Sequence, residues 1–349
     1  MGLQMHRSPF STSNAATLRN RRVFALVGGL AILAVAALAS LVIGSRPVPP
    51  ATVIAALFGD EVPRADAHAI LELRVPRTAL TILVGGALAV AGALIQTLTR
   101  NPLADPGILG VTSGSSFAVA LAVGLLGITR PSLYVWFALA GALAATLAVA
   151  LVGGAARGSV DPVRLLLAGV ALGAILSGIV SGLRIASPRT FNTIKVWEVG
   201  TFVDRNLTSC LPVVLIMLTG AVIALVLGKS LNALALGEEM ASALGTSVWR
   251  TRLLAVAAIT FLAGGATALV GPISFVGLMV PHVARWLTGQ DQRWIIACCL
   301  IWGPIITIFA DIAARIAVSP GEMPVGIVLS FLGGPVLVAL VRRRKALAL

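Results

Sequence analysis

The chain has 349 residues, of which 58% are hydrophobic and 11% are charged, and its mean hydropathy is +1.00. A soluble domain carries about 25% charged residues, so this composition excludes an ordinary soluble protein and indicates a polytopic membrane protein. The net charge of +13 points to basic cytoplasmic ends and contacts with anionic membrane lipid, and it gives no reason to expect nucleic acid as a partner.

The chain begins with a polar, basic stretch that precedes the first apolar run. Residues 1–22 are rich in serine, threonine and asparagine and contain Arg19, Arg21 and Arg22, so we predict a disordered cytoplasmic tail. Val23 to Ile43 is apolar for 21 residues and predicts the first transmembrane helix. A cleaved export signal is the alternative, but its apolar core is only about 7–15 residues long, which favours a retained helix.

Nine further apolar spans follow, at residues 78–98, 109–127, 133–153, 164–183, 211–228, 253–271, 272–288, 295–317 and 324–341. We divide the run 253–288 at Gly271-Pro272, because 36 residues are too many for one span. Ten spans place both termini on one side, and a modest excess of lysine and arginine marks that side as cytoplasmic. The predicted fold class is therefore an all-α polytopic membrane protein of about ten transmembrane helices, with a single transmembrane domain over residues 23–345.

One short motif could be mistaken for a nucleotide-binding site. Gly228-Lys229-Ser230 resembles the end of a phosphate-binding loop, but Ile223 stands where that loop requires its first glycine. The motif also ends an apolar span, where a strand, a loop and a helix would be needed. ATP binding by this route is excluded, so active transport would need ATP and Mg on a separate ATPase chain.

The cysteines and histidines, which are common metal ligands in proteins, are scattered along the chain. No CxxC or HxxxH spacing occurs, so these side chains do not build a local metal site. The residues concerned are Cys210, Cys298, Cys299, His6, His68 and His282. We therefore expect this chain to ligate no metal ion itself.

Five blocks of sequence carry a resemblance to a known family. They are RVPR to LTRNPLADPGILGV (Arg74 to Val111), LALGEEMASALG (234–245), GPISFVGLMVPH (271–282), ADIAAR (310–315) and EMPVG (322–326). Together they resemble the permease subunits of the iron-siderophore/vitamin B12 (FecCD-type) family of bacterial ABC importers. The amino-acid sequence of the first block is most similar to that of the ferric-siderophore branch.

This resemblance implies a multi-pass permease subunit in the bacterial cytoplasmic membrane that translocates a ferric siderophore, with cobalamin or haem as alternative cargoes. It also implies a homodimer, or a heterodimer with a sister permease, served by two cytoplasmic ATPase subunits and an extracytoplasmic substrate-binding protein. The chain itself would be no enzyme and would bind no cofactor.

Other classes of protein fit the sequence less well. A secondary transporter or channel would need several ionisable groups in mid-membrane. Asp311 is the one acid inside a predicted span, and Arg315, four residues later, predicts a local ion pair. An intramembrane enzyme would need a catalytic constellation within the spans, and the sequence contains none.

The inner loop after the sixth span contains a short acidic segment with apolar residues at helical spacing and glycine at each end. An amphipathic helix lying on the membrane is one interpretation, but anionic lipid disfavours its acidic charge. By resemblance, residues 234–246 are the coupling segment that docks on the ATPase. The residues expected at that contact are Leu236, Gly237, Glu238, Met240, Leu244 and Gly245.

Two short inner loops match, by position, the two cytoplasmic constriction loops of the family. The expected gate residues are Asn101 and Leu103 in the first loop and Pro162 and Val163 in the second. The second loop departs from the small hydroxyl residues of the vitamin B12 importer. The alternative is that both are ordinary helix starts with proline in the first turn.

Three arginines are predicted at the outer ends of spans, where the positive-inside rule disfavours cations. They are Arg74, Arg77 and Arg315. Snorkelling to lipid headgroups would explain any one of them. By resemblance, each matches a family position that pairs with glutamates on the binding protein, and an arginine fork suits that role.

Overall fold

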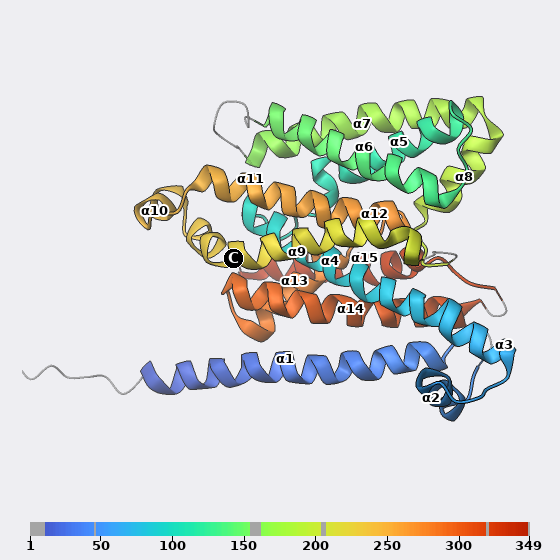
Figure 1. Ribbon diagram of the computed structural model, residues 1–349. Helices are drawn as coiled ribbons and strands as arrows, with labels where there is room; N and C mark the ends of the chain where they lie inside the picture. Colours follow the sequence, from blue (N-terminus) through green and yellow to red (C-terminus); the bar gives the residue numbers. More distant parts are fainter. Residues whose placement is uncertain (1–10, 45–46, 154–161, 204–206, 319–320, 348–349) are drawn as a thin grey trace, which may run out of the picture.

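The computed structural model describes residues 11–44, 47–153, 162–203, 207–318 and 321–347, and every regular element in these ranges is a helix (Figure 1). The predicted all-α fold class is thus confirmed. The elements are α1 (Ser11–Val42), α2 (Pro50–Phe58), α3 (Arg64–Ala67), η1 (His68–Arg74), α4 (Val75–Thr99), η2 (Pro106–Leu109), α5 (Val111–Gly124), α6 (Pro131–Val152), α7 (Pro162–Ala186), α8 (Pro188–Glu198), α9 (Leu207–Ala235), α10 (Glu238–Ala243), α11 (Val248–Ile259), η4 (Thr260–Gly264), α12 (Gly265–Val270), α13 (Val276–Thr288), α14 (Gln292–Ala317) and α15 (Val325–Leu347).

Seven helices in the described ranges are long and apolar enough to cross a membrane, and Val111–Gly124 and Val325–Ala339 are shorter apolar helices. The predicted break at Gly271-Pro272 is present, because α12 ends at Val270 and Gly271 adopts a φ of 81°. The predicted full span at 272–288 is wrong. The helix there, α13, has 13 residues and covers only about 20 Å, less than a bilayer core of about 30 Å.

The helix bundle has two distinct ends (Figure 1). The short helix α10, the start of α1 and the end of α15 lie at one end, called here the α10 end. Helices α2, α3 and α8 lie at the opposite end, called the α8 end. The predicted topology places both termini on one side of the membrane and would make the α10 end cytoplasmic.

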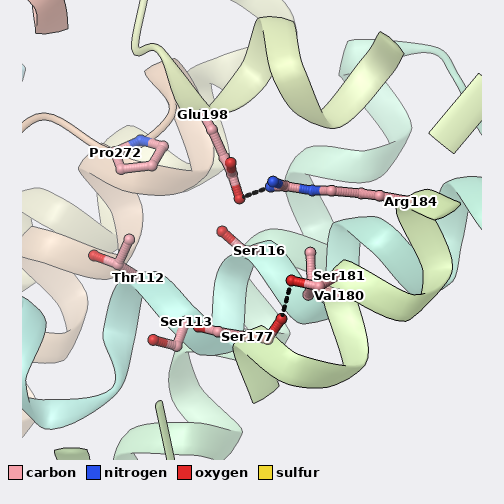
Figure 2. Close-up of a pocket in the computed structure, with 9 residues that line it drawn as sticks. All are labelled: Thr112, Ser113, Ser116, Ser177, Val180, Ser181, Arg184, Glu198 and Pro272. Carbon is pink, nitrogen blue, oxygen red and sulfur yellow. Dashed lines mark hydrogen bonds and ion pairs between the residues drawn. The ribbon is translucent and has the colours of Figure 1, made fainter. Parts of the chain in front are cut away.

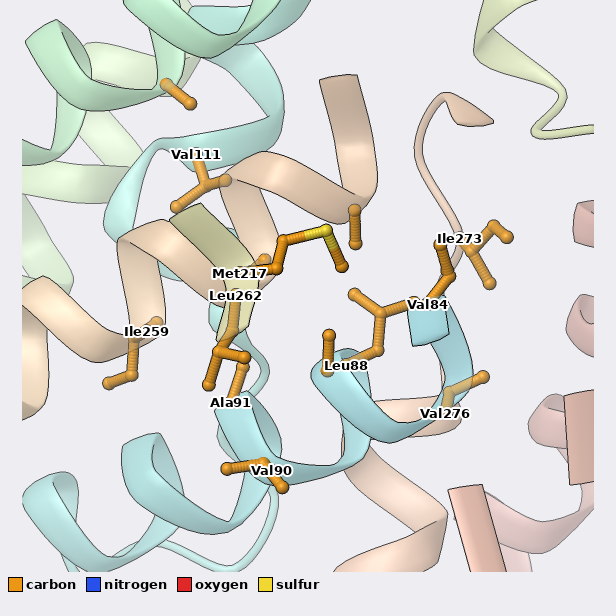
Figure 3. Close-up of a cluster of buried hydrophobic side chains, with 14 of the residues drawn as sticks. Val84, Leu88, Val90, Ala91, Val111, Met217, Ile259, Leu262, Ile273 and Val276 are labelled. Carbon is orange, nitrogen blue, oxygen red and sulfur yellow. The ribbon is translucent and has the colours of Figure 1, made fainter. Parts of the chain in front are cut away.

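Helix α4 forms the centre of the bundle, and 83% of the residues in its most apolar stretch are buried within the chain. Its side chains, among them Leu88, pack against those of α9, α11, η4 and α13, including Met217, Ile259 and Leu262 (Figure 3). Glycines permit the closest approaches, because a Cβ at Gly85 would meet the backbone of Gly303 and one at Gly92 would meet that of Gly277. These two glycines therefore let α4 pack closely against the backbones of α14 and α13.

The N-terminal tail is more ordered than predicted. Helix α1 begins at Ser11, so the prediction of a disordered tail is wrong for residues 11–22, and residues 1–10 lie outside the described ranges. Arg21 Nη2 donates to the Trp286 carbonyl (2.7 Å), and Arg22 Nε donates to the Thr288 carbonyl (2.9 Å). These carbonyls end α13 and have no intrahelical donor, so the two arginines cap α13 and hold this part of α1 against it.

Candidate functional site

A polar cavity of about 310 Å³ lies between α5, α7 and α8, beside the break that follows α12 (Figure 2). Two turns of α5 and two turns of α7 supply hydroxyl groups, and the ends of α7 and α8 supply a charged pair. The lining residues are Thr112, Ser113, Ser116, Ser177, Val180, Ser181, Arg184, Glu198 and Pro272. A membrane-spanning body normally keeps polar groups where they line a cavity or serve a function, so this concentration marks the candidate path for a cargo.

The charged pair closes the cavity toward the α8 end. A guanidinium nitrogen of Arg184 donates to Glu198 Oε1, joining the last turn of α7 to the last residue of α8. Both side chains keep contact with the cavity, with exposed fractions of 27% and 33%. Arg184 Nε is buried and has no hydrogen-bond partner in the part of the chain described.

A second, smaller hollow adjoins the first and shares Thr112 with it. Its volume of about 20 Å³ suits a single water molecule. Asp105, in the loop after α4, lines it and accepts a hydrogen bond from the Gly107 amide (2.8 Å), which starts η2. Burial raises the pKa of Asp105 and the Gly107 hydrogen bond opposes that rise.

The predicted coupling segment forms α10 and projects from the bundle (Figure 1). Gly237 precedes the helix with a φ of 117°, a conformation that side chains rarely adopt. Three apolar side chains are largely exposed at a spacing of four residues: Leu236 (69%), Met240 (51%) and Leu244 (61%). Arg252 Nη2 donates to Glu238 Oε1 (2.6 Å), which fastens α10 to α11.

The predicted gate residues lie near the α10 end on two different connections. Asn101 Oδ1 accepts from the Leu103 amide (3.0 Å), which makes a side-chain turn, and no helix begins before Pro106. The alternative that residues 101–103 are simply the first turn of the next helix therefore does not hold for the first loop. In the second loop, Pro162 is the first residue of α7 and Val163 is 63% exposed, whereas Asp161 lies outside the described ranges.

Two of the three predicted docking arginines share one carboxylate. Arg77 donates to Asp311 through Nη2 (2.8 Å) and to Glu322 through Nη1 (2.6 Å). Arg315 donates to Asp311 through Nε (3.0 Å), which confirms the ion pair predicted along one face of α14. The shared Asp311 side chain is 1% exposed, so two guanidinium groups compensate one buried carboxylate.

Two of the three arginines are buried within the chain. Arg74 is 9% exposed and donates through Nη1 to the carbonyls of Leu41 (2.7 Å) and Val42 (2.9 Å). Arg315 is 2% exposed and also donates to the end of α1. Both arginines thus satisfy carbonyls that a helix end leaves unpaired, whereas Arg77, which is 12% exposed, pairs with the partly exposed Glu322.

Comparisons with known proteins agree with this architecture. Residues 32–343 match the model of the FecCD transport family. The chain therefore belongs to the FecCD transport family. This FecCD protein is 46% identical over 323 residues to the ferric enterobactin transport system permease protein FepD of Escherichia coli, covering 93% of this chain and 96% of that one.

Other relatives have different cargoes in their names. The iron(3+)-hydroxamate import system permease protein FhuB of Bacillus subtilis is 38% identical, covering 93% of this chain and 84% of that one. The vitamin B12 import system permease protein BtuC of Yersinia enterocolitica is 40% identical, covering 79% and 82%. A solved structure of an inward-facing metal-chelate type ABC transporter superposes with a TM-score of 0.80 at 28% identity, covering 92% and 99%. The FecCD protein is therefore a polytopic transport permease.

Sequence reasoning missed the polar cavity. Its hydroxyl residues recur at a spacing of four on the helices concerned, Thr112 with Ser116 and Ser177 with Ser181. That spacing puts each pair on one helix face and was a usable signal. Two glycines of α7 differ from those of α4: a Cβ at Gly178 or Gly182 would meet nothing within 4 Å, so in the described part of the chain both face open space.

Proposed function

We propose that this chain is a permease subunit of an ATP-driven importer that carries a ferric siderophore across the bacterial cytoplasmic membrane. The observation that carries the proposal is the near full-length match to a ferric enterobactin permease, 46% identical over 93% of the chain. The polar cavity toward the α8 end and the exposed coupling segment at the α10 end support it, since an importer must receive cargo at one end and energy at the other.

The energy source is proposed to be two cytoplasmic ATPase subunits that bind ATP and Mg. In this chain, the lysine of the phosphate-loop-like motif, Lys229, lies inside the continuous helix α9, so the loop that would cradle phosphate is missing there. The ATPase is proposed to contact Leu236, Gly237, Glu238, Met240, Leu244 and Gly245, where exposed apolar side chains on a projecting helix offer a docking surface.

A second permease copy, or a sister permease, is proposed to cover α7. Only 17% of the residues in the most apolar stretch of α7 are buried within the chain, a smaller share than in any other candidate span of the described ranges. Ser177, Gly178, Ser181 and Gly182 leave small side chains there, and small residues allow the backbones of membrane helices to approach closely. Two copies meeting at α7 would bring two polar cavities near one central pathway.

The extracytoplasmic binding protein is proposed to dock at the α8 end. Arg77 would contact one of its glutamates, while Arg74 and Arg315 hold the end of α1 in place beneath that surface. The gate is proposed to lie at the opposite end, formed by Asn101, Leu103, Pro162 and Val163.

Cobalamin and haem remain alternative cargoes, because relatives named for vitamin B12 and hemin match 79% and 80% of the chain. Uptake should be measured in a strain that lacks this permease, against a panel of ferric siderophores, cobalamin and haem. Restored uptake of a ferric siderophore that needs an intact ATPase supports the proposal. Restored uptake of cobalamin or haem alone, or uptake that survives inactivation of the ATPase, contradicts it.

A further inference from the structure

The polar cavity contains hydroxyl groups that have no hydrogen-bond partner among the described residues. Elsewhere in the bundle, threonine hydroxyls donate to the carbonyl four residues earlier, as Thr97, Thr219 and Thr260 do. In the described part of the chain, the hydroxyls of Thr112, Ser113, Ser116 and Ser177 form no such bond (Figure 2). Ser181 alone among the cavity hydroxyls donates to a backbone carbonyl, that of Ser177 (2.9 Å). The cavity therefore presents unused donors and acceptors to whatever occupies it.

Arg184 also has donors to spare. Its guanidinium group has five N–H donors, one nitrogen contacts Glu198, and buried Nε has no partner in the described residues. Figure 2 shows the Arg184 and Glu198 side chains meeting above Ser116 and Ser181. Because both charged side chains are about a third exposed, their pairing contributes little to stability. Exchanging Glu198 for another anionic oxygen would therefore cost little.

We propose that the cavity is a cargo-contact site for an oxygen-rich, anionic metal chelate, in which Arg184 binds the anionic oxygens in exchange for Glu198. This inference rests on the proposed importer function and adds the residue that senses cargo charge. The hydroxyl groups are neutral and bind the oxygens of any chelate. Arg184 supplies a charge-assisted, two-pronged contact that favours an anion, and Glu198 keeps that charge compensated while the cavity is empty.

The test uses the complete importer, with its ATPase and binding protein, reconstituted in lipid vesicles. Uptake of iron is measured as a tris-catecholate complex, which is a trianion, and as a tris-hydroxamate complex, which is neutral. The variants are Arg184→Gln and Glu198→Gln. Arg189→Gln is the matched control, because Arg189 is exposed on α8 near the same end and does not line the cavity.

Arg184→Gln should lower kcat/KM for the anionic complex about tenfold and leave that for the neutral complex within about twofold, since one charge-assisted contact is lost. Glu198→Gln should keep or raise the preference for the anion, which tests the idea even if the first variant folds poorly. Equal losses for both complexes, no loss for the anion, or a reduced preference in Glu198→Gln would overturn the inference. A wild-type importer that moves neither complex would contradict the proposed function itself.

Discussion

Arg315, near the end of α14, binds Ser40, near the end of α1, through both of its terminal nitrogens. Nη1 donates to the Ser40 carbonyl (2.8 Å) and Nη2 donates to the Ser40 hydroxyl (3.0 Å). Nη1 also reaches the Ile43 carbonyl (3.1 Å). With Arg74 on the Leu41 and Val42 carbonyls, these bonds satisfy the last three carbonyls of α1 and that of Ile43 just after it, and the positive charge suits the negative end of the helix dipole.

The first prediction concerns this attachment. Arg315→Met should destabilise the permease by about 3 kcal/mol, because it removes one partner of the buried Asp311 carboxylate and frees the end of α1. Arg315→Lys should fall between wild type and Arg315→Met, since an ammonium keeps the charge but cannot reach Asp311 and Ser40 in the same way. Thermal unfolding in detergent micelles measures the effect.

Arg293→Met is the control for the first prediction. Arg293 lies on the same helix, but its side chain is 53% exposed and its ion pair with Asp291 is a surface contact. Such pairs contribute about 0–1 kcal/mol. If Arg315→Met and Arg293→Met unfold at the same temperature, the Arg315 contacts do not hold α1 in place.

The second prediction concerns docking of the binding protein. Arg77→Gln should slow its association with the importer and weaken the dependence of that rate on salt, because a rim charge mainly steers encounter. Glutamine can still donate to Asp311, which limits damage to the buried cluster. Association kinetics at low and high salt measure the effect, with the exposed Arg189→Gln as control. An unchanged salt dependence in Arg77→Gln would remove Arg77 from the docking surface.

Features set by neighbouring residues were predictable from the sequence. Apolar runs of membrane length predicted the main helices, and Gly271-Pro272 predicted a break, since glycine tolerates a positive φ and proline has no N–H. The pairing of Arg315 with Asp311 followed from a spacing of four along one helix. These inferences needed no knowledge of how distant segments pack.

Features set by packing between distant segments were not predictable. Arg315 and Ser40 are 275 positions apart, and nothing local indicates that a helix end will meet that guanidinium. The bonds of Arg74 to the end of α1 were unpredictable for the same reason, because the positive-inside rule describes membrane topology and ignores carbonyls that a neighbouring helix offers. The bonds of Arg21 and Arg22 to the end of α13 likewise join segments that lie far apart in the sequence.

The third prediction concerns the coupling segment. Met240→Glu should detach the ATPase and abolish uptake, because docking would bury the new carboxylate at an apolar contact at a high cost in free energy. The unfolding temperature should stay unchanged, since Met240 is exposed in the permease itself. Gly237→Trp would be a less direct test, since a φ of 117° strains any side chain at that position. Co-purification of the ATPase measures the effect. Glu239→Gln, one residue before, is the control, and an ATPase that stays bound to Met240→Glu contradicts the assignment.

The fourth prediction concerns the gate. Cysteines replacing Leu103 and Val163 should form a crosslink across the axis of the permease dimer in the resting state, and the crosslink should stop transport. The three native cysteines, Cys210, Cys298 and Cys299, are buried, so they should not compete for the reagent. Val163 is 63% exposed and partly buried Leu103 lies in a turn rather than a helix, so both positions can take up a cysteine with little cost to the fold.

Val152→Cys paired with Leu103→Cys is the matched control for the gate. Val152 is 69% exposed at the end of α6, the helix that precedes the connection to α7, but it is not a predicted gate residue. The control pair should crosslink poorly and leave uptake unchanged, since proximity across the axis and not exposure alone determines the reaction. Uptake that continues after complete crosslinking between positions 103 and 163 would mean that cargo passes elsewhere, and these residues would then be connections between helices without a gating role.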